Sequence, residues 1–224
     1  MSLAQKIVIY GTRGFAREVH QLITDASRAG AAVQCVGFLV DANYREHETV
    51  HDLPVFGDAT WLGQAPGVQV AIGIGATAPR HRIARWIEQE FGQRFVLLQH
   101  PRAYIGDRVL LGPGSIVCPG AVVTTDIAIG RHVQLHAGCT IGHDAVIADY
   151  ATIAPGANVS GRTVIGEGTF VGAGAVILPD VKVGRWSLIG AGAVVRKDVP
   201  DNVTVAGVPA RVIAQRKSGW HLDP

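Results

Sequence analysis

The sequence predicts an α/β domain at residues 1–100, a solenoid of short β-strands at residues 101–213 and a tail at residues 214–224. Two observations predict this organisation. In the first hundred residues, β-branched segments alternate with amphipathic helical segments, a pattern typical of a parallel sheet covered by helices. From Ile105 onward, an aliphatic residue recurs at every sixth position, a period that neither a helix nor a flat sheet produces.

The first domain is expected to contain alternating strands and helices. We predict strands at residues 6–11, 31–41, 68–75 and 94–101, and helices at residues 15–30 and 78–92. The first helix has one apolar face, formed by Phe15, Val19, Leu22, Ile23 and Ala26. This alternation indicates a shortened Rossmann-like unit with a parallel sheet.

A glycine loop joins the first strand to the first helix and consists of Gly11, Thr12, Arg13 and Gly14. Backbone amides in such a loop, together with the start of a helix, favour an anion such as a phosphate. Asp41 ends the second strand, where its carboxylate can accept hydrogen bonds from a ribose or sugar hydroxyl. These features predict a site for a nucleotide-type ligand. The alternative is a tight turn without a ligand and a carboxylate that caps its own loop.

The second domain is predicted from sixteen hexads in a single register. Each hexad has an aliphatic residue at the same position, namely Ile105, Leu111, Val117, Val123, Ile129, Leu135, Ile141, Ile147, Ile153, Val159, Ile165, Val171, Ile177, Val183, Ile189 and Val195. The next residue is often glycine, and the residue two positions before is usually small. We expect one short strand per hexad, with the aliphatic side chain inward, the small residue at a corner and the glycine in the turn.

The composition argues against several classes of function. The net charge is +2, and no cluster of Lys and Arg is interleaved with aromatic residues, so nucleic acid is not an expected partner. No apolar segment reaches the length of about 18 residues that a membrane span needs, and we expect a cytoplasmic protein without membrane contact. Cys35, Cys118 and Cys139 form no CxxC spacing and are expected to be buried thiols.

The hexads resemble the hexapeptide-repeat family, which forms a left-handed parallel β-helix with three faces and usually assembles as trimers. Four features in order resemble the sialic acid O-acetyltransferase / UDP-4-amino-sugar N-acetyltransferase family: the opening IVIYGTRGFAREV, the junction LLQHPRAYIG, the GHD within the repeats and the closing VAGVPARVI. The resemblance implies acetyl transfer from acetyl-CoA to an amine or hydroxyl of a sugar or nucleotide sugar, in a route such as polysaccharide biosynthesis. It also implies a homotrimer with active sites at the subunit interfaces.

The resemblance places the catalytic histidine at His143 and its adjacent carboxylate at Asp144. A neutral imidazole can take the proton of an attacking amine or hydroxyl, and the carboxylate can orient the imidazole and stabilise its charged form. Direct attack in a ternary complex needs no acyl-enzyme. By its position in the pattern, Gly161 is the candidate for the backbone amide that stabilises the thioester oxyanion.

The resemblance further implies that the first domain holds the nucleotide sugar and that acetyl-CoA lies along the later repeats. The residues expected to contact acetyl-CoA through their backbone are Gly172, Ala173, Gly190 and Ala191, with Arg211 near its phosphates. No metal ion is expected.

Three positions depart from the family pattern. Phe15 stands where a histidine often follows the glycine loop, and Thr152 stands where some members have a second histidine near the acetyl group. His136, which we assign to the substrate site, replaces a frequent asparagine. The choice between an amine and a hydroxyl acceptor therefore stays open.

Two other functions are compatible with the repeats. Gamma-class carbonic anhydrases are trimers of the same fold with a three-histidine zinc site, for which His132, His136 and His143 are candidates. Their paired ligands lie five residues apart, however, whereas His132 and His136 are four apart. The second alternative is a non-catalytic trimeric scaffold that binds a sugar nucleotide, for which His143 would be dispensable.

Overall fold

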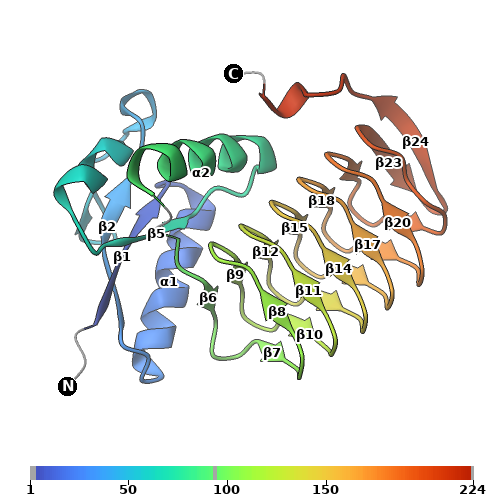
Figure 1. The fold of residues 1–224 in the computed structure, drawn as a ribbon, viewed down its shortest axis with the longest axis horizontal. Coiled ribbons are helices and arrows are strands. Elements are labelled where there is room, and N and C mark those ends of the chain that lie inside the picture. Colours follow the sequence, from blue (N-terminus) through green and yellow to red (C-terminus); the bar gives the residue numbers. More distant parts are fainter. Residues whose placement is uncertain (1–3, 93–94, 223–224) are drawn as a thin grey trace. The chain divides into compact units, whose positions relative to one another are not determined.

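The computed structural model describes residues 4–92 and 95–222. The chain divides into two compact units, Met1–Pro101 and Arg102–Pro224. Figure 1 shows the two kinds of structure that the sequence predicts, an α/β unit in blue to green and a stack of β coils in green to red, so the predicted fold class is confirmed. None of the helices in the described ranges is long and apolar enough to cross a membrane.

The first unit is built on a three-stranded parallel sheet in the order β2-β1-β5. The elements of this sheet and its helices are β1 (Gln5–Tyr10), α1 (Gly14–Arg28), β2 (Val33–Leu39), β5 (Gln69–Ile72) and α2 (Thr77–Phe91). The shorter elements are η1 (Ala42–Tyr44), β3 (Thr49–Val50), β4 (Leu53–Pro54), η2 (Ala59–Gln64) and β6 (Leu98–Gln99). In β1, Ile7, Val8 and Ile9 are fully buried, because a central parallel strand has both faces covered.

Two details of the first unit differ from the sequence prediction. Of the strand expected at residues 94–101, Arg94 lies outside the described residues, and the described part contains β6 and one parallel bridge between Phe95 and Val70. Phe15 is only half-buried, and Ala16 packs on the sheet in its place. A side chain at Gly73 would begin 2.6 Å from the Ala16 Cα, so this glycine lets α1 approach the sheet.

The second unit is a left-handed β-helix with three parallel sheets, one along each face of the coils. We label the three faces D, E and C, and every coil passes through them in that order. Face D consists of β7 (Tyr104–Ile105), β10 (Val122–Val123), β13 (Thr140–Ile141), β16 (Asn158–Val159), β19 (Val176–Ile177) and β22 (Val194–Val195). Face E consists of β8 (Leu110–Leu111), β11 (Ala128–Ile129), β14 (Val146–Ile147), β17 (Val164–Ile165) and β20 (Lys182–Val183). Face C includes β9 (Ile116–Val117), β12 (Gln134–Leu135), β15 (Thr152–Ile153), β18 (Phe170–Val171) and β21 (Leu188–Ile189).

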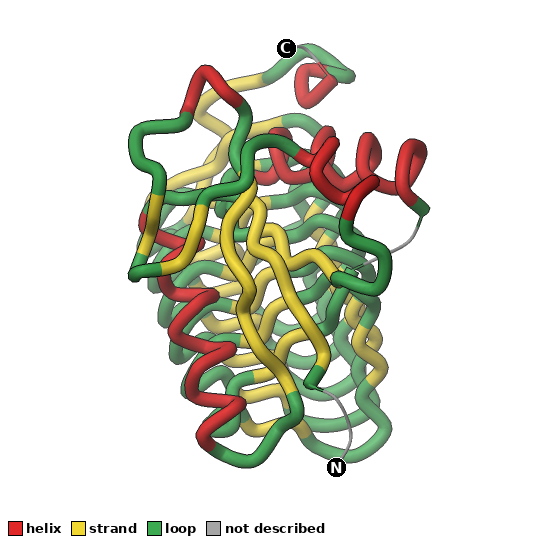
Figure 2. The backbone as a smooth tube through the Cα atoms, turned by 90° about the vertical axis from the view of Figure 1, so that its left-hand side faces the viewer, coloured by secondary structure: helices red, strands yellow, loops and turns green. Residues whose placement is uncertain are grey.

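Each coil up to β22 contains eighteen residues, so that residue i pairs with residue i+18, as Val123 does with Ile141; in the last coil the spacing falls to sixteen, as between Ile189 and Val205. The second residue of each strand points inward and is the aliphatic residue of the hexad. In Figure 2 the short yellow strands alternate with green turns along the stacked coils. The inward residues form one continuous core with the small corner residues, among them Ala121, Cys139, Ala157 and Ala175.

Each turn between faces contains one residue in the left-handed region, three positions after the inward aliphatic. Between faces D and E these residues are Arg108, Asp126, Asp144, Arg162 and Asp180. Between faces E and C they are Gly114, His132, Tyr150, Gly168 and Trp186. Between faces C and D they are Gly120, Gly138, Gly156, Gly174 and Gly192. The corner between faces D and E is therefore charged, the corner between faces E and C is largely aromatic, and the corner between faces C and D has only glycine at this position. We call them the charged, the aromatic and the bare corner.

The explanation expected for the glycine that follows each aliphatic residue is wrong. These glycines do not adopt positive φ; the residue two positions later does. A Cβ at Gly106 would lie 1.8 Å from the Thr124 carbonyl oxygen, and a Cβ at Gly142 would lie 2.5 Å from the Gly161 amide nitrogen. Glycine is needed at this position because the backbone of the next coil occupies the space of a side chain.

The C-terminal residues close the last coils. β23 (Val203–Gly207) and β24 (Ala210–Gln215) form an antiparallel hairpin across the cis peptide between Val208 and Pro209, so the hairpin extends past the predicted boundary at residue 213. η3 (Trp220–Leu222) then returns to Trp186. The His221 ring stacks on Trp186 at 3.6 Å, and the Trp220 indole donates to the Trp186 carbonyl.

The position of Trp186 predicts different losses of stability when two turn glycines with positive φ are replaced by alanine. Gly168 and Gly156 have φ of +63° and +66°, so alanine at either should cost about 1–2 kcal/mol of backbone strain. At Gly168 the added Cβ would also meet the Trp186 ring at 2.2 Å, whereas at Gly156 no atom lies within 4 Å. We expect Gly168→Ala to lower the unfolding temperature clearly more than Gly156→Ala in thermal denaturation. Equal shifts would contradict the predicted contact with Trp186.

Candidate active site

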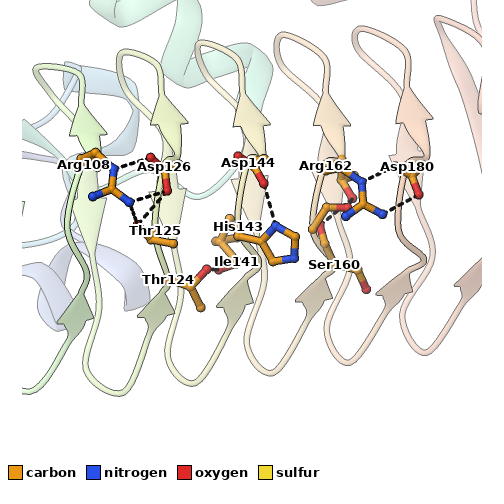
Figure 3. A network of polar contacts seen from close by, with 12 residues as sticks. Arg108, Thr124, Thr125, Asp126, Ile141, His143, Asp144, Ser160, Arg162 and Asp180 are labelled. Atoms are coloured by element: carbon orange, nitrogen blue, oxygen red, sulfur yellow. Dashed lines mark hydrogen bonds and ion pairs between the residues drawn. The ribbon is translucent and has the colours of Figure 1, made fainter.

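His143 lies at the charged corner, two residues after the inward Ile141 of β13. Its Nδ1 is 2.7 Å from Oδ2 of Asp144, and both side chains are about half exposed, at 53% and 56%. Figure 3 shows this pair in the middle of the corner. A carboxylate at Nδ1 selects the imidazole tautomer that is protonated there, which leaves Nε2 as the basic nitrogen.

Gly161 lies one coil after His143 at the equivalent position. A Cβ at Gly161 would lie 2.7 Å from the His143 Nε2, so the imidazole lies against the backbone where only glycine leaves room for it. The His143 carbonyl accepts a hydrogen bond from the Arg162 amide at 2.8 Å, and the Gly161 carbonyl accepts one from the Asp180 amide at 3.2 Å. The basic nitrogen of His143 and the predicted oxyanion residue are therefore neighbours.

Two ion pairs flank His143 along the same corner. Arg108 pairs with Asp126, and Arg162 pairs with Asp180 through Nε at 2.6 Å and a terminal nitrogen at 2.9 Å. The hydrogen bond from Arg108, helped by one from Thr125, lowers the pKa of Asp126 to about 2. The hydrogen bond from Arg162 lowers the pKa of Asp180 in the same way, so both carboxylates stay charged across the physiological range.

The residues predicted to contact acetyl-CoA lie at the bare corner between faces C and D. The amides of Gly172 and Gly190 donate to the next coil, to Ile189 and Val205, at 2.9 and 2.8 Å. Because these amides are used in the coil-to-coil ladder, the exposed Ala173 and Ala191 are the better candidates for backbone contacts with a ligand.

His136 occupies the position of Gly172 and Gly190 in an earlier coil and is partly buried. It therefore lies at the bare corner, whereas His143 lies at the charged corner. Within one chain, the structure does not bring His136 and His143 together.

Arg211 lines a cavity of about 320 Å³ at the end of the β-helix. Arg196 and Lys197 line the same cavity and are exposed, as Arg211 is. The amide of Lys182 donates to Asp198, the acidic residue of the lining, at 2.8 Å. Arg196 and Lys197 were not among the residues predicted from the sequence, although two successive cationic residues are a signal for an anion site.

The first unit contains a cavity of about 500 Å³ lined by four of the five residues predicted for the nucleotide site. These are Gly11, Thr12, Arg13 and Asp41, while Gly14 is not part of the lining. Phe15, at the departure from the family pattern, lines it as well. The glycine loop and the end of β2 thus meet in a single concave site, as expected for adjacent parallel strands.

Tyr10 and α2 contribute lining that the sequence pattern did not predict. Tyr10 is 1% exposed, and its hydroxyl donates to Oδ1 of Asp41. Burial raises the pKa of Tyr10 above its usual value, and the hydrogen bond to Asp41 adds to the effect, so the phenol remains a donor. From α2 come Pro79, Arg82 and Ile83, whose spacing of three and four residues marks one helical face.

The histidines of the zinc-enzyme alternative are not gathered into a site. His132 is fully buried at the aromatic corner and stacks on Tyr150 at 5.1 Å. Within residues 4–92 and 95–222, no group of three or more His, Cys, Asp or Glu is arranged to hold a metal ion.

Known proteins resemble both units. Residues 6–87 match the family described as PglD N-terminal domain, and residues 126–161 and 162–197 match the family described as bacterial transferase hexapeptide (six repeats). No curated protein sequence matches the chain. Among solved structures, WeeI from Acinetobacter baumannii AYE is 31% identical with a TM-score of 0.81, over 95% of this chain and 100% of WeeI. This chain belongs to the hexapeptide-repeat sugar acetyltransferases with a PglD-type N-terminal domain.

Two further members of this family have been solved with bound molecules. PerB from Caulobacter crescentus, in complex with CoA and GDP-perosamine, is 28% identical with a TM-score of 0.83, over 96% of this chain and 100% of PerB. The acetyltransferase domain of PglB from Neisseria gonorrhoeae FA1090, in complex with acetyl coenzyme A, is 28% identical with a TM-score of 0.83, over 94% of this chain and 100% of that domain. Membership confirms the predicted enzyme class, a sugar acetyltransferase.

The buried cysteines of this acetyltransferase should be poor nucleophiles. Burial raises the pKa of Cys139 to about 12 and that of Cys35 to about 11, and Cys118 is also buried. At pH 8 the thiolate fraction of Cys139 is then on the order of one in ten thousand. We expect slow reaction of the folded protein with a disulfide reagent such as DTNB and rapid release of three equivalents after denaturation. A thiol that reacts in the folded protein as fast as in the denatured one would contradict this prediction.

Proposed function

We propose that the protein transfers the acetyl group of acetyl-CoA to the amino group of a sugar carried on a nucleoside diphosphate, with His143 as the general base. The observation that carries the proposal is the arrangement around the imidazole: Asp144 binds Nδ1, and Nε2 faces the backbone at Gly161. The amine acceptor is supported by the perosamine N-acetyltransferase among the similar structures.

In the proposed reaction, Nε2 of His143 takes a proton from the attacking sugar amine. The amine nitrogen bonds to the thioester carbonyl carbon, the negative charge develops on the carbonyl oxygen, and the Gly161 amide donates to that oxygen. The carbon–sulfur bond then breaks, and the His143 imidazolium returns the proton to the leaving thiolate of CoA. Asp144 holds the ring and stabilises its positive charge. No covalent acyl-enzyme forms, in keeping with the buried state of the three cysteines.

The first unit supplies a suitable site for the nucleotide portion of the acceptor. The cavity at the carboxyl ends of β1 and β2 combines the glycine loop with Arg13 and Arg82 for phosphates and with Asp41 for hydroxyl or amide donors. Tyr10 orients the Asp41 carboxylate. Phe15 lines the cavity at the family histidine position and offers an aromatic surface to the ligand in place of a polar contact.

The division of the proposed site between two corners supports a homotrimer with shared active sites. His143 and Gly161 lie at the charged corner, whereas Ala173 and Ala191 lie at the bare corner, and we infer that acetyl-CoA reaches both sets between two copies of the chain. Exposed aliphatic residues flank the charged corner on both faces, with Val122 on face D and Val146 and Val164 on face E. Such a surface is typical of a subunit interface.

Acetyl-CoA and nucleotide sugars are cytoplasmic metabolites, so the proposal places the enzyme in the cytoplasm. An acetylated amino sugar on a nucleotide carrier is a building block for a polysaccharide or a similar glycan. Arg211, with Arg196 and Lys197, provides a cationic cavity of the kind that the phosphates of acetyl-CoA need.

The decisive experiment measures CoA release from acetyl-CoA with a panel of GDP-, UDP- and dTDP-linked amino sugars and simple sugar hydroxyls. With the best acceptor, we expect His143→Ala to lower kcat by about 10²–10⁴-fold, because the attacking amine loses its base. The unfolding temperature should change little, because His143 is exposed and outside the core.

The comparison variant is His136→Ala, which removes the histidine assigned to the substrate site at the bare corner; we expect it to raise the KM for the acceptor and to change kcat much less than His143→Ala does. Wild-type turnover of His143→Ala would overturn the assigned role of His143, and would favour the scaffold alternative if no acceptor supports CoA release at all. A strong effect of both variants would locate part of the chemistry at the bare corner.

A separate prediction concerns the nucleotide cavity. Tyr10→Phe keeps the buried ring and removes only the hydroxyl that donates to Asp41. A hydrogen bond to a charged group contributes about 1.5–3 kcal/mol, so we expect the KM for the nucleotide sugar to rise about 10-fold or more with little change in kcat. Asp41→Asn should have a similar effect, and Tyr104→Phe, an exposed position in the second unit, should have none. An unchanged KM in Tyr10→Phe and Asp41→Asn would exclude this cavity as the nucleotide site.

A further inference from the structure

The charged corner carries a regular ladder of side chains. Successive coils present Arg108, Asp126, Asp144, Arg162 and Asp180, spaced by eighteen residues and all with positive φ between 55° and 65°. Figure 3 shows these five residues side by side on consecutive coils. Because neighbouring strands lie about 4.8 Å apart, each side chain can reach the ladder residue directly before or after it but not the one beyond.

Arg162 has a carboxylate on each side in this ladder. Asp144 precedes it by one coil, and Asp180 follows it by one coil. The guanidinium binds Asp180 with two nitrogens, at 2.6 and 2.9 Å. The hydrogen bond and charge of Asp180 raise the pKa of Arg162, and the charge of Asp144 adds to that effect, so the guanidinium is within electrostatic reach of both carboxylates.

His143 and Arg162 therefore compete for the same carboxylate. Asp144 binds the His143 Nδ1, and a guanidinium is a stronger partner for a carboxylate than a neutral imidazole is. An Arg162 without a partner of its own would pair with Asp144 and compensate its charge. The imidazole would then lose its orientation and the stabilisation of its protonated form.

We propose that Asp180 is a positioning residue that holds Arg162 away from Asp144 and so reserves Asp144 for His143. This inference rests on the proposed role of His143 as the base. It assigns a function to an ion pair that the repeat does not need, since the coils are held together by backbone hydrogen bonds and the inward core. An exposed ion pair of this kind, with side chains 53% and 63% exposed, contributes little to stability.

The opposite side of Asp144 offers a matched control. Asp126 is also bound by an arginine through two nitrogens, and its charge acts on His143 as that of Asp180 does. Its partner Arg108 lies two coils from Asp144, however, and cannot reach it. Loss of either Asp removes one negative charge near His143, but only loss of Asp180 frees an arginine next to Asp144.

The test is Asp180→Asn in the full-length enzyme. Asparagine keeps the size of the side chain, tolerates the positive φ of this position and preserves the amide that donates to Gly161, but it cannot hold a guanidinium through two carboxylate oxygens. We expect kcat to fall by about 10- to 100-fold, the range found when a metal-binding histidine loses the outer partner that orients it.

The controls separate this role from a change of charge alone. The charged groups that face His143 are Asp126, Asp144 and Asp180, with Arg108 and Arg162 beside them. Asp126→Asn should keep kcat within about 2- to 3-fold of the wild type, and the double variant Asp180→Asn with Arg162→Gln should recover most of the lost turnover, because the competing cation is gone.

Equal effects of Asp180→Asn and Asp126→Asn, or a double variant no faster than Asp180→Asn, would overturn the inference. His143→Ala distinguishes this failure from a failure of the proposed function. If His143→Ala abolishes turnover while Asp180→Asn leaves kcat unchanged, the base assignment stands and only the role of Asp180 is wrong. If His143→Ala is fully active, the inference falls with the proposed function.

Discussion

The backbone hydrogen bonds between successive coils are the constraint on which the second unit depends. They fix the repeat at eighteen residues, and any two positions separated by that number stand one above the other. The relation between His143 and Gly161 is a direct consequence, as is the relation of Arg162 to its two carboxylates. A rigid spacing set by the backbone is what a general base needs, because its position relative to the oxyanion donor then requires no side-chain adjustment.

The same ladder explains the distribution of glycines. Where a turn brings one coil against the next, as at Gly142 beneath the Gly161 amide, no side chain fits. Where the turn needs a left-handed residue, the chain uses only glycine at the bare corner, Arg and Asp at the charged corner, and both glycine and aromatic residues at the third corner. At the charged corner, Asp144 has a left-handed backbone conformation, and its carboxylate binds the Nδ1 of His143. Backbone strain at a candidate active site is a recurrent association in proteins.

The proposed ligand sites of the two units are built differently. The first unit uses a cavity at the ends of parallel strands, with a buried Tyr10 orienting Asp41. The second unit is a filled prism, since its inward positions are closed by aliphatic side chains. Its chemistry is therefore restricted to turns at the corners, and the residues assigned to one reaction lie at two different corners. An assembly of several copies is the simplest way to bring such corners together.

Much of this protein follows from its sequence alone. The sixfold period determined the β-helix and its core, because an inward aliphatic column has only one register. The alternation in the first hundred residues determined the parallel sheet, and the GHD segment indicated His143 and Asp144. The tertiary structure decided what depends on residues distant in the chain. Only stacking revealed that Gly161 lies against the imidazole, that the amides of Gly172 and Gly190 are used between coils, and that His136 lies at another corner. The contact of Tyr10 with Asp41 was also revealed only by the tertiary structure, because Asp41 follows the neighbouring strand, thirty-one residues later. A period read from a sequence fixes which residues are equivalent, but contacts across coils and strands arise only once the chain is folded.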